Sequence, residues 1–131
     1  MATPIQSSGD SENVKVLLRG VTSLSPPTVT YNNNINYTTT SKTIAHNLGF
    51  VPTVLAFYGN GTEKFPLPLS AMTPAPGSPV GNFSMVEVSY SVDENNLYFE
   101  NKLTVSQAGS GSAEGLTVEV TYYLLRLGIS L

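Results

Sequence analysis

The sequence predicts an all-β fold: a single antiparallel β-sandwich, jelly-roll-like in its simplest form, with seven or eight strands. Short apolar runs are separated by turn-rich segments, and none of the runs carries a sustained helical period. Two runs alternate apolar and polar residues, at 86–92 and at 116–124, as expected for strands with one face inward and one in water. The second alternation gives way to a continuous apolar run at 122–125, where both faces of the strand are expected to be covered.

The chain divides into a short tail and one domain. Residues 1–13 contain too few apolar side chains to offset the entropy lost on ordering, so we expect a mobile tail before a sandwich domain at 14–131. A domain of this size buries roughly two thirds of the surface of its unfolded chain, which is enough for one core. The strands are predicted, in order, at 14–18, 34–38, 42–45, 53–58, 85–92, 96–105 and 116–127.

The connections differ in character. Residues 93–96 predict a hairpin turn, and the Gly- and Ser-rich segment 106–115 predicts a flexible loop. The segment 59–82 is longer than an ordinary connection, is rich in proline and still contains four large apolar residues, which are Phe65, Leu67, Leu69 and Met72. Because this is more apolar surface than a solvated loop exposes, we predict an interface between copies of the chain, with a trimer favoured. The alternative is that the four residues close one open end of their own sandwich.

Residues 43–58 predict a strand, a tight corner and a second strand. Asn47 and Gly49 tolerate left-handed backbone, and Pro52 lacks an N–H, so it belongs just before or at the start of the second strand. We expect His46 to hydrogen-bond the corner locally through a ring nitrogen rather than to act as a general base or a ligand.

This corner resembles a motif of bacteriophage and prophage tail proteins: a strand ending in His-Asn-Leu-Gly, then an aromatic residue, an aliphatic residue and Pro, followed by a hydrophobic strand. It is more distantly similar to the corresponding strand entry of H-type lectin domains. Residues 92–101 together with 118–125 look like the closing strands of the same tail-protein domains. The resemblance implies a tail or fibre protein acting in assembly and host attachment. The lectin likeness implies a lectin-like sandwich that forms oligomers and binds sugars, but no sugar-contacting residue can be carried over.

Composition excludes several classes of function. The chain has no Cys, so it can form neither a disulfide framework nor a thiolate metal site or nucleophile. The net charge is −3 and the six Lys and Arg residues are scattered, which argues against nucleic-acid binding. No apolar run approaches the roughly 20 residues that span a bilayer, and residues 1–13 do not have the pattern of a signal peptide. A virion protein assembled in the bacterial cytoplasm meets these constraints.

An enzyme is not predicted. His46 is the only histidine, and no Ser lies in a nucleophile-elbow sequence. Glu87, Glu100 and Glu119 lie on predicted strands and are the carboxylates that a glycan-cleaving enzyme would pair, but the alternation places Glu87 and Glu119 on a solvated face. Residues 93–96 offer oxygen ligands without the Gly and distal Glu of an EF-hand loop, so we expect a turn, no metal and no cofactor.

A polar, aromatic-flanked stretch is the candidate glycan-binding patch, formed by Tyr31, Asn33, Asn34 and Tyr37. The alternative is an Asn-rich turn between two sheets. The predicted function is therefore a non-enzymatic virion tail or fibre protein that acts in assembly and host attachment. Its expected partners are other copies of itself, other virion proteins and a host cell-surface glycan. The alternatives are a carbohydrate-binding module and, behind it, a glycan-cleaving enzyme.

Overall fold

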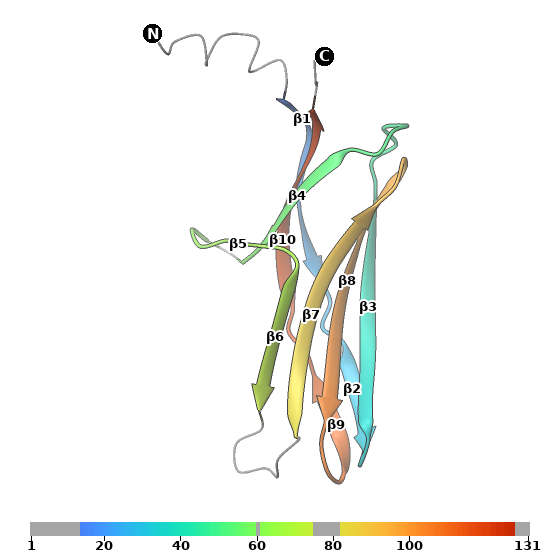
Figure 1. The fold of residues 1–131 in the computed structure, drawn as a ribbon, viewed down its shortest axis with the longest axis vertical. Helices are drawn as coiled ribbons and strands as arrows, with labels where there is room; N and C mark the ends of the chain where they lie inside the picture. Colours follow the sequence, from blue (N-terminus) through green and yellow to red (C-terminus); the bar gives the residue numbers. More distant parts are fainter. Residues whose placement is uncertain (1–13, 60, 75–81, 128–131) are drawn as a thin grey trace.

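The computed structural model describes residues 14–59, 61–74 and 82–127, which form ten β-strands and no helix (Figure 1). The strands are β1 (Val14–Leu24), β2 (Thr28–Asn32), β3 (Ile35–Ala45), β4 (Thr53–Tyr58), β5 (Phe65–Pro66), β6 (Leu69–Pro74), β7 (Phe83–Val92), β8 (Asn96–Ser106), β9 (Ser110–Glu114) and β10 (Val118–Leu127). They form two four-stranded sheets, β1-β10-β4-β5 and β3-β8-β7-β6, and a two-stranded sheet, β2-β9, all antiparallel. The predicted all-β antiparallel architecture is confirmed.

The predicted number of seven or eight strands is wrong, because strands form where the local pattern is weak. Residues 110–114, predicted as part of a flexible loop, are β9 and pair with β2 from Thr28↔Glu114 to Asn32↔Ser110. The long segment 59–82 contains β5 and β6, which add to the edges of the two larger sheets. Residues 1–13, where the tail was expected, and residues 75–81 lie outside the described residues.

β8 is the central strand of the fold. It pairs with β3 along its whole length and with β7 from Leu97 to Ser106. Every second side chain of β8 points into the sandwich and is buried: Leu97, Phe99, Asn101, Leu103 and Val105. The opposite set points to the outer face of this sheet, as the period of two requires.

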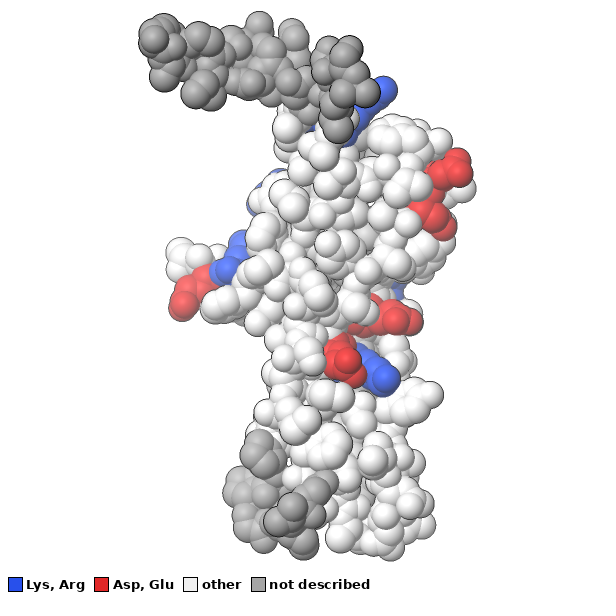
Figure 2. Space-filling model, in the orientation of Figure 1, with Lys and Arg blue, Asp and Glu red and all other residues white. Residues whose placement is uncertain are grey.

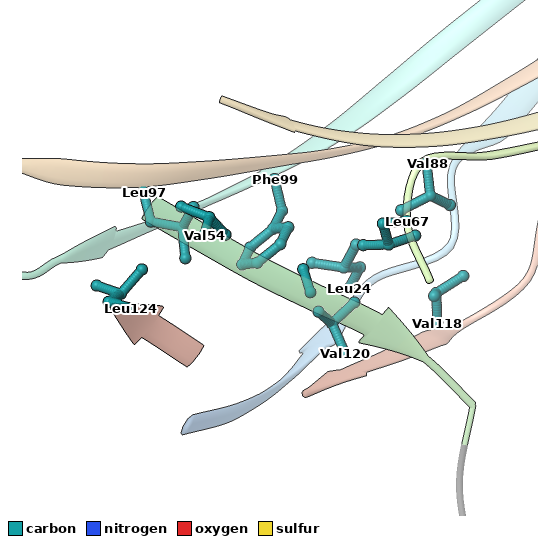
Figure 3. Packing of buried hydrophobic residues seen from close by; sticks show 10 residues of the cluster. Leu24, Val54, Leu67, Val88, Leu97, Phe99, Val118, Val120 and Leu124 are labelled. Atoms are coloured by element: carbon teal, nitrogen blue, oxygen red, sulfur yellow. The ribbon is translucent and has the colours of Figure 1, made fainter. Parts of the chain in front are cut away.

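The main core lies between β8 and the β1-β10-β4 sheet (Figure 3). Phe99 occupies its centre, with its ring 5.9 Å from that of Tyr122 and 6.3 Å from that of Tyr90, centroid to centroid. A second cluster, Val29 with Leu103 and Val105, fills the space beneath β2-β9. The β1-β10-β4-β5 sheet and the β2-β9 sheet therefore both pack against the same long sheet, β3-β8-β7-β6.

Asn101 bonds the two connections, β1–β2 and β9–β10, through which the chain passes between the β1-β10-β4-β5 sheet and the β2-β9 sheet. Its side chain is fully buried, and its Nδ2 donates to the carbonyl of Ser25, between β1 and β2, at 3.2 Å and to that of Leu116, between β9 and β10, at 2.9 Å. Nearby, the Gly115 N–H donates to the Pro27 carbonyl at 2.7 Å. These bonds satisfy backbone groups where the pairing of strands stops, which a buried connection requires.

Candidate functional site

His46 follows β3 and is buried, with both ring nitrogens engaged within the chain. The Leu48 N–H donates to Nδ1 at 3.0 Å, so Nδ1 is an acceptor and the proton of the neutral ring lies on Nε2. Nε2 in turn donates to the Asp93 carbonyl at 2.8 Å. With one nitrogen accepting and the other donating, the ring has no free position for a substrate or a metal. His46 therefore holds the corner in place.

The corner docks on the turn between β7 and β8. The N–H groups of His46 and Asn47 both donate to the Asn95 carbonyl, at 2.8 and 3.1 Å, and that of Gly49 donates to the Glu94 carbonyl at 3.0 Å. Asn47 and Gly49 adopt positive φ values of 53° and 81°, which turn these N–H groups toward the neighbouring loop. Pro52 immediately precedes β4, where the absence of an N–H costs no ladder bond.

Asp93 organises the turn on which the corner rests. Its Oδ1 accepts the N–H groups of Asn95 and Asn96 at 2.8 and 2.7 Å, and its Oδ2 accepts the Tyr98 hydroxyl at 2.6 Å. The Tyr98 hydroxyl and then the two N–H groups lower the pKa of the carboxyl below its ordinary 3.8. The same bond raises the pKa of the Tyr98 phenol. The carboxylate is thus used as a hydrogen-bond acceptor for the turn.

The four residues of the predicted oligomer interface do not share a surface. Leu67 is 7% exposed and belongs to the main core, so the interface prediction is wrong at this residue, which the chain buries itself. Leu69 is half-buried against the same core. Only Phe65 and Met72 are exposed, and they lie in β5 and β6, which are edge strands of two different sheets. Leu67 and Leu69 thus close the chain's own sandwich, as the alternative predicted for all four residues, whereas Phe65 and Met72 do not.

The structure also divides the predicted glycan patch. Tyr31 packs against the smaller core, and its hydroxyl covers Gly111 so closely that a Cβ there would lie 2.6 Å from it. Asn33, with a φ of 58°, forms the β2–β3 turn and accepts the Gly109 N–H through Oδ1 at 2.6 Å. Asn34 is exposed at this turn. Tyr37, 66% exposed, lies instead on the outer face of β3. The patch as predicted is not one surface.

The candidate carboxylates lie on two different sheets. Glu87 and Glu100 share the outer face of β7 and β8, where Glu87 is directly opposite Lys102 and Glu100 is directly opposite Ser89. Glu119 is on β10, in the other sheet. The described part of the chain contains no group of three or more His, Cys, Asp or Glu side chains that could hold a metal ion.

Two surfaces of the molecule were not found by the sequence reasoning. The first, called here the polar face, is the outer side of β3, β8 and β7, where a hollow of about 290 Å³ is lined by Ser41, Thr43, Ser89, Ser91, Tyr98 and Glu100 among others. Its signal in the sequence is the run of Thr and Ser at 38–43, of which residues 39–41 were left between two predicted strands that are one strand, β3, in the structure. The residues of this face are brought together by strand pairing alone.

The second surface, called here the apolar face, is the outer side of β1, β10 and β4. It is formed by Val16 and Val21 of β1, Tyr123 and Leu125 of β10, and Leu55 and Phe57 of β4. Val16, Val21 and Leu55 are 60%, 56% and 46% exposed. The charged side chain within it, Arg19, lies over the Tyr123 ring at 5.6 Å from its centroid. The run at 122–125 was its signal in the sequence.

Charge is sparse, because only 11% of the residues are charged, and Figure 2 shows a mostly uncharged face with a few small groups of acidic and basic side chains, two of which place red beside blue. Within the described ranges no helix has the length and the apolarity needed to cross a membrane.

In comparisons with known proteins, no family model, no curated protein and no solved structure matched the chain.

Proposed function

We propose that the domain is a non-enzymatic structural protein of a bacteriophage or prophage virion, of tail or fibre type, that works as a homo-oligomer in assembly and host attachment. The observation that carries the proposal is the apolar face. The resemblance of residues 43–58 to tail proteins supplies the class of particle, and the apolar face supplies the means of assembly.

The apolar face is built like the inner faces of the sandwich. Its central strand, β10, already buries Thr121 and Leu125 on this side, which are 1% and 7% exposed, because the flanking strands shelter them. The flanking residues themselves remain in solvent, with Val21 opposite Thr121 and Leu55 opposite Tyr123. The continuous apolar run of β10 thus predicts a cover on both sides, and the residues that the structure describes provide only the inner one.

The cover that we propose is the same face of another copy. Two twisted sheets pack face to face at about 10 Å, which is how this chain already buries its other side. About six residues along each of the three strands, the length of β4, give a face of roughly 20 by 14 Å. That is sufficient for the apolar centre of a standard interface of about 800 Å² per partner, whose rim is polar. Arg19 does not oppose the contact, because it is stacked on Tyr123 and its Nε donates to the Tyr123 hydroxyl at 3.4 Å.

A non-enzymatic role is supported by how the reactive groups are used. His46 accepts from the corner through one ring nitrogen and donates to the β7–β8 turn through the other, and the carboxylate of Asp93 is committed to its own turn. Glu87 and Glu100 stand on an open sheet face, where no described element covers them to exclude water. General acid–base work on a glycan requires two carboxyl groups converging on one bond, with one of them in a sheltered setting.

Particle association tests the proposed function directly. Antibody raised against the purified chain and coupled to gold is applied to particles released on lysis of the source cells, and electron microscopy records where the gold lies. We expect gold on the tail or its fibres, and adjacent tail genes around the coding sequence. Gold confined to cell debris, together with neighbouring genes unrelated to virions, would remove the virion from the proposal.

A further inference from the structure

The polar face presents an ordered array of hydrogen-bonding side chains along β8. Four residues of β8 point outward in sequence: Tyr98, Glu100, Lys102 and Thr104. On one flank β3 places Thr43, Ser41, Thr39 and Tyr37 directly opposite them, and on the other β7 places Ser91, Ser89, Glu87 and Met85. The register therefore forms transverse rows of three residues, most of which contain a hydroxyl.

The first two rows are hollowed. Their flanks carry Ser41, Thr43, Ser89 and Ser91, whose short side chains leave the space of about 290 Å³ above the sheet. That volume is close to the lower limit for small-ligand sites. Each hydroxyl both donates and accepts, and the Glu100 carboxylate accepts only, so the hollow suits a ligand that carries many hydroxyl groups.

Two aromatic side chains stand at the ends of the array, and both are held in place. Tyr98, in the first row, donates its hydroxyl to Asp93 and accepts the Asn96 side-chain amide at 3.3 Å. Tyr37, in the fourth row, has the Lys102 Nζ over its ring at 4.5 Å from the centroid. Six residues of strand separate the two rows, or about 20 Å. A held aromatic ring offers an apolar platform at little entropic cost, because its rotamer is already fixed.

We propose that the polar face binds a neutral oligosaccharide chain lying along β8, with one sugar ring in the hollow at Tyr98 and the chain extending toward Tyr37. The hydroxyls of Ser41 and Ser89 contact the ring in the hollow from the two flanks, and Glu100 accepts from its hydroxyls. The ligand is neutral because the charges around the array nearly balance: Glu87 and Glu100 are matched by Lys102, which lies over Tyr37, and by Lys42, which also lines the hollow.

The inference deepens the attachment part of the proposed function and rests on it for the source of the glycan, a host cell surface. It does not depend on the apolar face, because the polar face is on the other sheet. The contact residues also differ from those of the β2–β3 turn: of the patch expected from sequence, only Tyr37 belongs to the polar face.

Binding to defined oligosaccharides tests the inference on the full chain in its native assembly. Cellotetraose and maltotetraose are the neutral probes and tetragalacturonate is the acidic one, each titrated calorimetrically, with amide chemical shifts followed by NMR. Ser89→Leu and Ser41→Leu fill the hollow without removing a charge. Ser112→Leu makes the same change at an exposed position of β9, away from the polar face, and Asn34→Ala probes the β2–β3 turn.

We expect a neutral probe to bind, to shift the amides of Ser41, Ser89 and Tyr98, and to lose about tenfold or more in affinity in the two hollow-filling variants. Ser112→Leu and Asn34→Ala are expected to bind like the unmodified chain. Absence of binding by both neutral probes, binding of the acidic probe alone, or binding that survives Ser89→Leu would each overturn the inference. Light scattering on the same samples reports the assembly, so loss of the glycan site is distinguished from loss of the oligomer.

Discussion

Replacing His46 by Ala should destabilise the domain, because the role of His46 is structural. The substitution removes the acceptor of the Leu48 N–H and the donor to the Asp93 carbonyl, which lie 3.0 and 2.8 Å from the ring nitrogens. Both groups are in the contact between the corner and the β7–β8 turn, and the ring that shields them is itself 7% exposed. Water therefore replaces the two bonds poorly.

The size of the effect follows from these two bonds. Each contributes a net stabilisation of about 1 kcal/mol, and a backbone group left unpaired in a sheltered position adds about 1 kcal/mol or more. We expect the free energy of unfolding to fall by about 2–3 kcal/mol. For a domain of this size that corresponds to a Tm lower by about 8–12 °C.

Thermal unfolding followed by circular dichroism, at one fixed protein concentration, measures this change. Asn47→Gly is the matched control, because it alters the adjacent corner residue at a φ that Gly adopts freely and removes no side-chain bond found in the structure. Its Tm is expected to stay within about 2 °C of the unmodified chain. A Tm for His46→Ala that is equally unchanged would show that the ring does not hold the corner.

Three further outcomes follow from the structure. Gly49→Val should lower the free energy of unfolding by about 1–3 kcal/mol in urea titrations, because a β-branched residue is strained at a φ of 81° although the space around the position is open; an unchanged urea midpoint would show that the corner relaxes. Leu67→Asp should unfold the chain, at a cost of about 3–5 kcal/mol, because it places a carboxyl in the main core; a folded variant that merely dissociates would restore Leu67 to an interface. The lowered pKa of Asp93 contributes stability that is present above the unfolded pKa of 3.8 and is lost as the pH falls through the folded pKa. The raised pKa of Tyr98 contributes stability that is present below the unfolded pKa of 10.0 and is lost as the pH rises through the folded pKa. Tm measured against pH should therefore fall less steeply at the acid end in Asp93→Asn than in the unmodified chain, and an identical acid limb would contradict the assignment.

The parts of the fold that the sequence predicted are those that local chemistry decides. Period-two alternation located β7 and β10, and residues 93–96 formed the hairpin turn as expected. The corner at 46–52 was readable because Asn, Gly and Pro each restrict the backbone in a known way.

The missed parts depend on pairing between distant segments. β2 and β9 are short, and β9 reads Ser-Gly-Ser-Ala-Glu, so neither strand has a strong signal by itself. They form because β2 and β9 pair with each other and because together they cover Leu103 and Val105 of β8. No local pattern contains that information.

The prediction of candidate sites from the sequence was limited in the same way, because neighbours in sequence can lie on different surfaces of the fold. Phe65 and Leu67 are two residues apart in sequence, yet one is 48% exposed and the other belongs to the core. Tyr31 and Tyr37 flank the same Asn-rich turn but stand on different surfaces, because β2 and β3 belong to different sheets. The polar and apolar faces appear only when the register of three strands is known.

The molar mass of the chain in solution tests the central claim, that the apolar face joins copies of the protein. Light scattering coupled to gel filtration, repeated over a range of loading concentrations, should give a multiple of 13.9 kDa for the unmodified chain. The double variant Val21→Asp and Leu55→Asp places two carboxylates on the exposed flanks of this face, outside the core. It should run as a 13.9 kDa monomer with an unchanged β-type circular dichroism spectrum. Thr39→Asp, a single charge added on the opposite outer face, should leave the mass of the assembly unchanged. A monomeric unmodified chain, or a double variant that keeps the original mass, would contradict the account.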